Sequence, residues 1–230
     1  MIRQTESNLI KSLPLFKDVS DAHFDELVSA AFLQRFPQGI VLIQEGDLPD
    51  FLHIVVEGSV ELFAQHNGHE TALDIMQPVT TFILAAVIRD GVYLKSARTL
   101  TPTQILMIPA QAVRDVFDHD AAFARAIVNE LAVRYRCVVR SLKNEKLRTS
   151  AERLANWILQ EESNQGNQRQ IALSIDKRTL ASRLGMTPEN LSRNLAQLQK
   201  YGVTNSGANF VINDMTALRQ FAKPNELIDQ

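Results

Sequence analysis

A run of residues without any glycine or proline, from Ala110 to Leu147, constrains this chain more than any other feature. Because these two residue types most often end helices, their absence predicts one long helix, with a kink near Asp118–Asp120 left open. Strand and turn signals precede the run, and helical patterns follow it. A chain of 230 residues with 45% hydrophobic content can fill one large core or two modest ones, and this change of pattern favours two domains.

Apolar side chains recur within the run at steps of three and four residues, which is the spacing of a helix face that packs on another helix. The members of this face are Ile127, Leu131, Tyr135, Val138 and Leu142. Two interpretations are open: the helix packs into the chain's own core, or it pairs with a second copy of the chain as a dimerisation helix. Basic residues collect between Arg134 and Arg148, a pattern that most often marks a solvated face.

Between Phe36 and Pro109 short apolar runs alternate with glycines at intervals of about ten residues, which predicts an all-β sandwich or barrel. The glycines concerned are Gly39, Gly46, Gly58 and Gly68, and each is expected to have a positive φ at a tight turn. Gly68, between Asn67 and His69, is expected at a hairpin tip. The segment before the strands, residues 6–33, predicts short helices interrupted at Pro14.

The last third of the chain contains two short helical patterns separated by Gly185, Met186 and Thr187. Pro188 suits the first position of the second helix and Thr187 its N-cap, so the segment predicts a helix-turn-helix. Leucines at positions 191, 195 and 198 form a stripe to be buried. The remaining side chains are of types that read bases and phosphates, and with Thr187 they are the predicted DNA contacts: Glu189, Asn190, Ser192, Arg193 and Gln197. Two short strands around Gly207 predict a wing.

Composition narrows the class of protein further. The net charge of −2 and pI near 6.2 require any nucleic-acid site to be a local patch. One cysteine, Cys137, cannot form a disulfide framework, and neither a signal peptide nor an apolar run of about 20 residues is present, so we expect a protein of the cytoplasm with no membrane contact. Phosphate-binding loops, a serine-histidine-aspartate arrangement and metal-spaced His/Cys clusters are missing, which argues against an enzyme and names no metal ligands.

The order of a β-roll, a long helix and a winged helix resembles the CRP/FNR family of bacterial transcription regulators. The most specific part is the Glu45-Gly46-Asp47 turn followed by Val56-Glu57-Gly58-Ser59-Val60. The resemblance implies an α+β fold with a cyclic-nucleotide-binding-like β-roll (residues 1–109), a long dimerisation helix and hinge (110–147) and a winged helix-turn-helix (148–230). It also implies a homodimer on double-stranded DNA, and contact with RNA polymerase. Glu189, Ser192 and Arg193 match the family's ExxSR pattern for TTGAT-like half-sites, which favours FNR-type specificity.

The same resemblance places an effector pocket at Phe82, Ile83, Leu84, Lys95 and Ser96. Ile83 and Leu84 stand where cyclic-AMP-binding members have Gly and Glu, and Lys95 stands for Arg, so the ribose acceptor is missing and the phosphate fork is reduced to a point charge. Cyclic AMP is therefore disfavoured. A single cysteine also excludes an iron–sulfur cluster held by this chain alone.

Several alternatives remain for the signal. Haem, as in the DNR- or NnrR-like members, would need an axial ligand from a set of candidates by residue type: His23, His53, His66, His69, His119 and Met107. Three other sources of control are open: another small apolar ligand, oxidation of Cys137, or no effector at all in a constitutive regulator. A protein that only binds a ligand in its β-roll is the alternative function.

Overall fold

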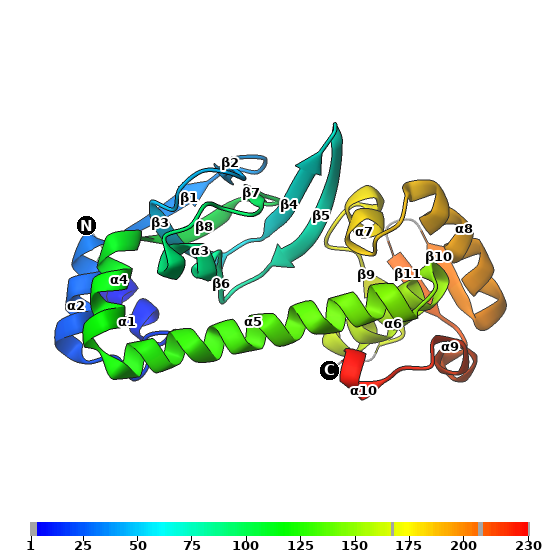
Figure 1. Cartoon of the computed structure of the whole chain (residues 1–230). Helices are drawn as coiled ribbons and strands as arrows, with labels where there is room; N and C mark the ends of the chain where they lie inside the picture. Colours follow the sequence, from blue (N-terminus) through cyan, green and yellow to red (C-terminus); the bar gives the residue numbers. More distant parts are fainter. Residues whose placement is uncertain (1–3, 167, 207–208, 230) are drawn as a thin grey trace. The chain divides into compact units, whose positions relative to one another are not determined.

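The computed structural model describes residues 4–166, 168–206 and 209–229, and the chain divides between Arg134 and Tyr135 into two compact units, the N-terminal and the C-terminal unit. Figure 1 labels the helices and strands and colours the chain from blue at the N-terminus to red at the C-terminus. Those that begin in the N-terminal unit are α1 (Gln4–Lys11), α2 (Asp21–Ala30), β1 (Phe32–Phe36), β2 (Val41–Ile43), β3 (Phe51–Glu57), β4 (Val60–His66), β5 (His69–Met76), β6 (Thr80–Phe82), α3 (Leu84–Arg89), β7 (Ser96–Thr99), β8 (Thr103–Pro109), α4 (Ala110–His119) and α5 (Ala121–Leu147). Those of the C-terminal unit are α6 (Ser150–Asn164), β9 (Gln170–Ala172), α7 (Lys177–Arg183), α8 (Pro188–Leu198), the 3-10 turn η1 (Gln199–Tyr201), β10 (Val203–Ser206), β11 (Asn209–Ile212), α9 (Met215–Ala222) and α10 (Glu226–Asp229).

Two four-stranded antiparallel sheets form the body of the N-terminal unit, with strand orders β1-β8-β3-β6 and β2-β7-β4-β5. Successive side chains of a strand point to opposite faces, so each sheet has an inner and an outer face. Val55 and Ile105 from the first sheet meet Val60 and Leu62 from the second in one buried apolar cluster. The predicted sandwich-like β-roll is therefore confirmed.

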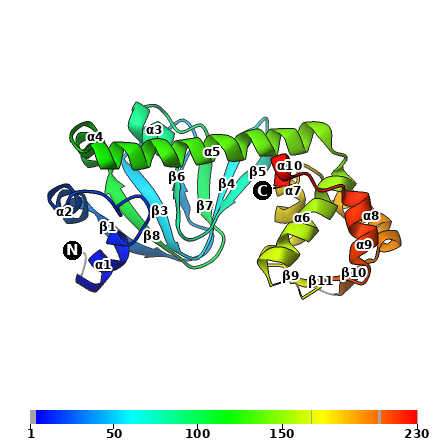
Figure 2. The same ribbon diagram turned by 90° about the horizontal axis from the view of Figure 1, so that it is seen from below.

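Helices cover the other face of the first sheet. Leu52 and Ile54 of β3 and Leu106 and Ile108 of β8 point away from the inner cluster and pack with residues of α2, α4 and the first turns of α5. Figure 2 shows α2 at the end of the unit where β1 and β8 lie, and α2 contacts β8. The strand residues thus alternate between two cores, which explains why the sequence of β3 is apolar at nearly every position.

The turns of the β-roll follow the predicted glycines. Gly39, Gly46, Gly58 and Gly68 all have positive φ. Asn67 and Gly68 are both in the left-handed region at the tip of the β4–β5 hairpin, the conformation of a tight two-residue turn. A Cβ atom on Gly58 would lie 2.5 Å from the Pro102 carbonyl oxygen, so this position has no room for a side chain.

Two expectations need correction. Residues 36–109 are not all-β, because α3 follows β6, and β1 already begins at Phe32. The Gly/Pro-free run is not one continuous helix either, because it is broken at Asp120, within the span where a kink was left open, and the backbone of Asp120 is extended. The carboxylate of Asp120 accepts hydrogen bonds from the amides of Ala122 and Phe123 at 2.9 Å each, so this residue starts α5 as an N-cap does.

The C-terminal unit packs α6, α7, α8 and α9 against a small antiparallel sheet with the order β10-β11-β9. Its core holds leucines of α6, α7 and α8 together with Phe210 of β11. The paired strands β10 and β11 are the predicted wing, and residues 207 and 208 at their connection lie outside the described residues. The expected α+β fold class, with a β-roll, a long helix and a winged helix-turn-helix, is thereby confirmed.

Candidate nucleic-acid interface and effector region

The turn between α7 and α8 is built from local signals. Asp176 caps α7 by accepting a hydrogen bond from the amide of Thr179 at 2.7 Å. Gly185 takes a positive φ between the two helices. Thr187 then caps α8 through a hydrogen bond from the amide of Asn190 at 3.2 Å, with Pro188 at the first helical position. Local hydrogen bonds and backbone conformation thus define where α8 begins.

The outer face of α8 carries every predicted DNA contact of this helix. Thr187, Glu189, Asn190, Ser192, Arg193 and Gln197 are all exposed. Leu191 and Leu198 are buried in the core, and Leu195 is partly buried against it. Asn194 is buried as well, which the leucine pattern did not predict; its amide donates to the Met186 Sδ at 3.4 Å. The position was inferable, since it lies three residues after Leu191 on the same face.

Two charged side chains on the outer face of α8, Glu189 and Arg193, interact with each other. The pKa of the Glu189 carboxyl is held below its ordinary value by hydrogen bonds from its own backbone amide and from Thr187, and by the positive charge of Arg193. Glu189 and Arg193 are four residues apart, with the acid nearer the positive end of the helix dipole. The hydroxyl of Ser192 donates to the Pro188 carbonyl at 3.0 Å. The acid and the arginine therefore lie together on the exposed surface.

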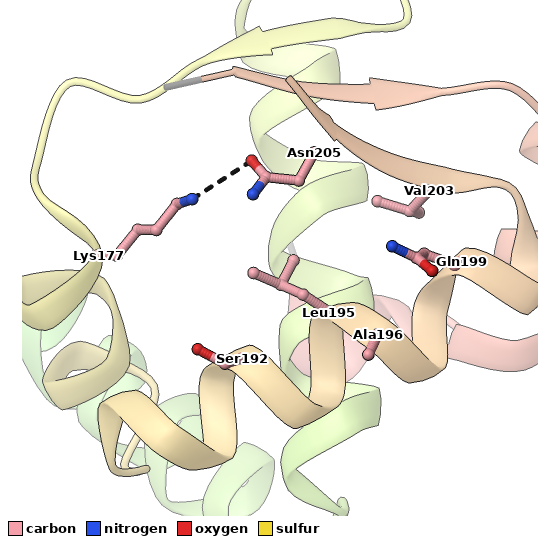
Figure 3. A pocket seen from close by; sticks show the side chains of 7 residues that line it. All are labelled: Lys177, Ser192, Leu195, Ala196, Gln199, Val203 and Asn205. Atoms are coloured by element: carbon pink, nitrogen blue, oxygen red, sulfur yellow. Dashed lines mark hydrogen bonds between the residues drawn. The ribbon is translucent and has the colours of Figure 1, made fainter. Parts of the chain in front are cut away.

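A hollow of about 190 Å³ lies beside this helix, between α8, the start of α7 and the wing strand β10 (Figure 3). Its lining residues are Lys177, Ser192, Leu195, Ala196, Gln199, Val203 and Asn205. Lys177 Nζ donates to Asn205 Oδ1 at 3.3 Å across its mouth. Besides Lys177, three polar side chains line the hollow, Ser192, Gln199 and Asn205, and Ser192 also belongs to the outer face of α8.

The predicted effector residues do not all line one space. Phe82 is buried in the inner cluster of the β-roll, with Ile83 partly buried next to it at a positive φ. Leu84 packs instead in the helical cluster on the other side of the sheet. The hydroxyl of Ser96 accepts a hydrogen bond from the Glu45 amide at 3.0 Å. Of the five, only Phe82 and Ile83 share the inner cluster, and Ser96 already holds the Glu45 turn.

Lys95 belongs to a charged group that the sequence did not reveal. Burial lowers the pKa of Lys95, Asp74 opposes this effect, and Arg134 adds to it. Arg134 Nε in turn donates to Glu130 Oε1 at 2.9 Å, and Thr81 donates to the same oxygen at 3.0 Å. The only sequence signal was the four-residue spacing of Glu130 and Arg134 on a helix. Two cations and two carboxylates thus lie near one another.

The candidate haem ligands differ sharply in their surroundings. His66 and His69 are exposed at the hairpin tip, and the exposed His119 contacts the Asp115 carbonyl at 2.7 Å. His23 Nδ1 lies 2.9 Å from Asp120. His53 is only 3% exposed and stacks on Phe82 with 5.2 Å between ring centroids.

His53 has two further properties of a potential ligand-binding group. Its Nδ1 atom is buried without a hydrogen-bond partner. Burial lowers the pKa of His53 to about 4, against a smaller opposing effect of a hydrogen bond to the Phe51 backbone, so the ring is neutral at pH 7. Met107 is partly buried and directly opposite His53 on the neighbouring strand β8.

The predicted dimer face divides along α5. Ile127 is fully buried in the core of the N-terminal unit and Leu131 is partly buried against it, so the first half of the face is an intramolecular contact. Tyr135 and Val138 are 70% and 65% exposed, and Leu142 is also exposed. The intramolecular reading therefore holds for the first half of the face, while dimerisation through the exposed second half stays a prediction.

The residues described by the structure contain no group of three histidine, cysteine or acidic side chains placed to hold a metal ion. Within the same residues no helix has the length and apolar character needed to cross a membrane. Cys137 is half-buried and unpaired.

Comparison with known sequence families identifies both parts of the chain. Residues 33–120 match the cyclic nucleotide-binding domain, and residues 152–221 match the Crp-like helix-turn-helix domain. The chain is 25% identical to the "CRP-like cAMP-activated global transcriptional regulator" of Mycobacterium tuberculosis over 194 aligned residues. The aligned region covers 82% of this chain and 87% of that protein.

Two solved structures share the fold. FixK2 from Bradyrhizobium japonicum is 19% identical with a TM-score of 0.72, over 85% of this chain and 98% of that one. DNR from Pseudomonas aeruginosa is 21% identical with a TM-score of 0.52, over 96% of this chain and 99% of that one. At these identities the likeness concerns the fold.

Proposed function

Because the chain belongs to the CRP/FNR family of transcription regulators, we propose that it binds double-stranded DNA as a homodimer and reads a palindromic, TTGAT-like site through α8. The observation that carries this proposal is the outer face of α8, where six side chains able to contact bases and phosphates are exposed on a helix anchored by buried leucines. The protein then acts in the cytoplasm, and its contact with RNA polymerase depends on where the DNA site lies.

Each residue type has a matching role in the major groove. Arg193 can donate two hydrogen bonds to guanine O6 and N7, while Glu189 can accept from cytosine N4 and orient the arginine. Ser192 can contact a thymine or a phosphate. Thr187 and the first amides of α8 would face a phosphate, because the helix dipole favours negative charge there.

Arg193→Ala tests this assignment. We expect a loss of about 1–3 kcal/mol in binding to a TTGAT palindrome and a weaker preference for the contacted base pair. Fluorescence anisotropy on duplexes that differ at single half-site positions, at one fixed salt concentration, measures both effects. The matched control is Arg219→Ala, which removes the same charge from the exposed surface of α9. Equal behaviour of the two variants would overturn the docking arrangement.

The homodimer is proposed to form through the exposed apolar residues in the second half of α5, chiefly Tyr135, Val138 and Leu142. Val138→Asp should weaken dimerisation by about 2 kcal/mol, or about thirtyfold, since it buries a charge in an apolar contact. Sedimentation equilibrium checks this, with Leu73→Asp on the exposed part of β5 as the control. A wild-type protein that is monomeric at micromolar concentration would contradict the proposal.

For the effector, we propose a neutral, largely apolar small molecule rather than cyclic AMP. Arg134 Nε already donates to Glu130 Oε1 at 2.9 Å, and Lys95 is a largely buried lysine under the influence of the negative charge of Asp74, which makes this region a poor match for an anionic phosphate. Calorimetric titration with cyclic AMP is the direct test. Tight stoichiometric binding of the nucleotide would overturn this part of the proposal.

Haem is a specific second candidate, supported by the unpartnered Nδ1 atom of His53. A bound haem would supply an iron centre that takes up small gases. The visible spectrum of the protein, titrated with haem under reducing conditions with and without nitric oxide, decides this. A stoichiometric Soret band that is lost in His53→Ala and kept in His119→Ala supports it, whereas a spectrum of free haem removes it and leaves other neutral ligands.

A further inference from the structure

A single guanidinium group in the C-terminal unit joins the hinge segment, residues 144–150, to the turn of the helix-turn-helix. Arg153 lies in the first turns of α6. Its Nη1 atom donates to the Arg148 carbonyl at 3.0 Å and, more weakly, to the Glu145 carbonyl at 3.5 Å. Its Nε and Nη2 atoms donate to the carbonyls of Leu184 and Gly185 at 2.9 and 3.1 Å.

These acceptors are the unpaired carbonyls at the ends of two helices. The last carbonyls of a helix have no partner within the helix and carry its negative partial charge. Arg153 therefore caps the C-terminal ends of both α5 and α7 with one planar, always charged group. A lysine at this position could not reproduce a fork that spans both helix ends.

The hinge side of this connection is held in turn by the C-terminal segment. Arg148 Nη1 and Nη2 donate to the two carboxylate oxygens of Asp229 at 2.5 and 2.7 Å, and the Arg148 side chain is only 7% exposed. Arg148 Nη1 also donates to Asn144 Oδ1 at 3.1 Å. A two-bond arginine–carboxylate pair of this kind has a well-defined geometry as well as strength.

The segment that carries Asp229 is anchored at further points. The Asn225 amide donates to Asp229 Oδ2 at 2.7 Å, and Lys143 Nζ donates to the Leu227 carbonyl at 3.2 Å. Burial on its own would raise the pKa of Asp229, but the bonds from Arg148 and the Asn225 amide hold this pKa below its ordinary value, so the carboxylate stays charged at pH 7. The C-terminal segment, residues 225–229, is thus bound by hydrogen bonds to the last turns of α5 and to Arg148.

We propose that the Arg148–Asp229 pair and Arg153 form one connection that sets the position of the turn before α8, so that the C-terminal segment helps to determine DNA affinity. Arg148, Arg153 and Asp229 are positioning residues that act through the backbone of the hinge and the turn. The proposal rests on the proposed function, because α8 is taken as the element that contacts DNA.

The test compares four variants of the full chain. Asp229→Asn removes the charge without changing shape, and its matched control is Glu226→Gln, an exposed carboxylate in the same segment without a described partner. Arg153→Lys keeps the charge and loses the fork, and Arg153→Gln loses both. Anisotropy on the TTGAT palindrome and hydrogen exchange of the amides of residues 184–190 are measured for each, with exchange in α9 as the internal reference.

We expect Asp229→Asn and Arg153→Lys to lower DNA affinity by about three- to thirtyfold, the range for residues that modulate coupling without touching the ligand. Base preference and salt dependence stay as in the wild type, because no DNA contact is removed. The amides of residues 184–190 exchange faster in both variants while those of α9 do not, a result that a general loss of stability would not produce.

If the wild type binds DNA and Asp229→Asn behaves like Glu226→Gln in both measurements, the connection does not position the turn and the inference is overturned, while the proposed function stands. If the wild type binds no DNA, the proposed function fails. Hydrogen exchange needs no DNA and still decides whether Asp229 and Arg153 hold the turn.

Discussion

The outer face of α8 and the interior of the β-roll are built in opposite ways. The face of α8 comes from eleven consecutive residues whose caps, turn and buried stripe are all local. The inner cluster of the β-roll brings together residues of every strand from β2 to β8, many of which are far apart in the chain. The predicted DNA contacts of α8 face solvent, and Asn194 is a buried polar exception on this helix. In the β-roll, the His53 ring is buried against Phe82, and its Nδ1 atom has no hydrogen-bond partner.

Because of this difference, substitutions on the outer face of α8 should affect DNA binding with little change in stability, whereas substitutions inside the β-roll should affect stability. An exposed side chain can change DNA affinity without unfolding the unit that carries it, because it makes few contacts in the folded chain. A side chain inside the β-roll contributes to stability and to the shape of any ligand space at once. The single tryptophan, Trp157, lies in α6 and reports unfolding of the C-terminal unit, while circular dichroism reports both units.

The largest effect is expected at Gly58. A methyl group there would meet the Pro102 carbonyl at 2.5 Å and the Thr103 Oγ1 at 2.6 Å, at a φ of +84°. Gly58→Ala should destabilise the N-terminal unit by about 2–5 kcal/mol, from steric overlap added to backbone strain. Gly39→Ala is the control, because Gly39 has nearly the same φ and open space around it, and it should cost only about 1–2 kcal/mol. Urea unfolding followed by circular dichroism measures the stability of both variants. Equal losses of stability would show that the close contact at Gly58 does not contribute to the destabilisation.

The next effect concerns pH and His53. Burial lowers the pKa of His53 from 6.5 to about 4, so the unfolded chain takes up a proton more readily than the folded one. Stability of the N-terminal unit should therefore fall as the pH drops from 6.5 to 4, by about 3 kcal/mol in total. Asp120, whose pKa is lowered chiefly by the Phe123 amide, acts only at more acidic pH, below its ordinary value of 3.8.

His53→Phe should remove the loss between pH 6.5 and 4, and His66→Gln at the exposed hairpin tip should not. Urea midpoints at several pH values give the comparison. A pH dependence that persists unchanged in His53→Phe would mean that another group carries it.

The smallest effect is expected on α8 itself. Thr187→Ala removes the N-cap and should lower the stability of the C-terminal unit by about 1 kcal/mol, as seen by Trp157 fluorescence. Ser192→Ala, on the exposed face of the same helix, should change stability by less than about 0.5 kcal/mol. If Ser192→Ala proved the more destabilising variant, the distinction between a residue that caps the helix and a residue exposed on the outer face of α8 would fail.

The helix-turn-helix, its cap and its exposed face could be predicted from the sequence because each depends on neighbouring residues. The same holds for the glycine turns of the β-roll and for the order of the domains. The roles of Glu189, Ser192 and Arg193 on DNA, and of the effector residues, stay predictions.

The remaining features needed the tertiary structure, because they join residues distant in sequence. Asp120 breaks the long helix by serving as the cap of α5 while Ser20 and His23 bind its other oxygen. The five apolar residues of the dimer face look alike in sequence, and only packing separates buried Ile127 from exposed Tyr135. Arg153 and Asp229 read as ordinary surface charges until the ends of α5 and α7 and the C-terminal segment are brought within hydrogen-bond distance of them. Local periodicity determines which elements form, whereas the partners of a charge or an apolar face are set by which elements meet in space.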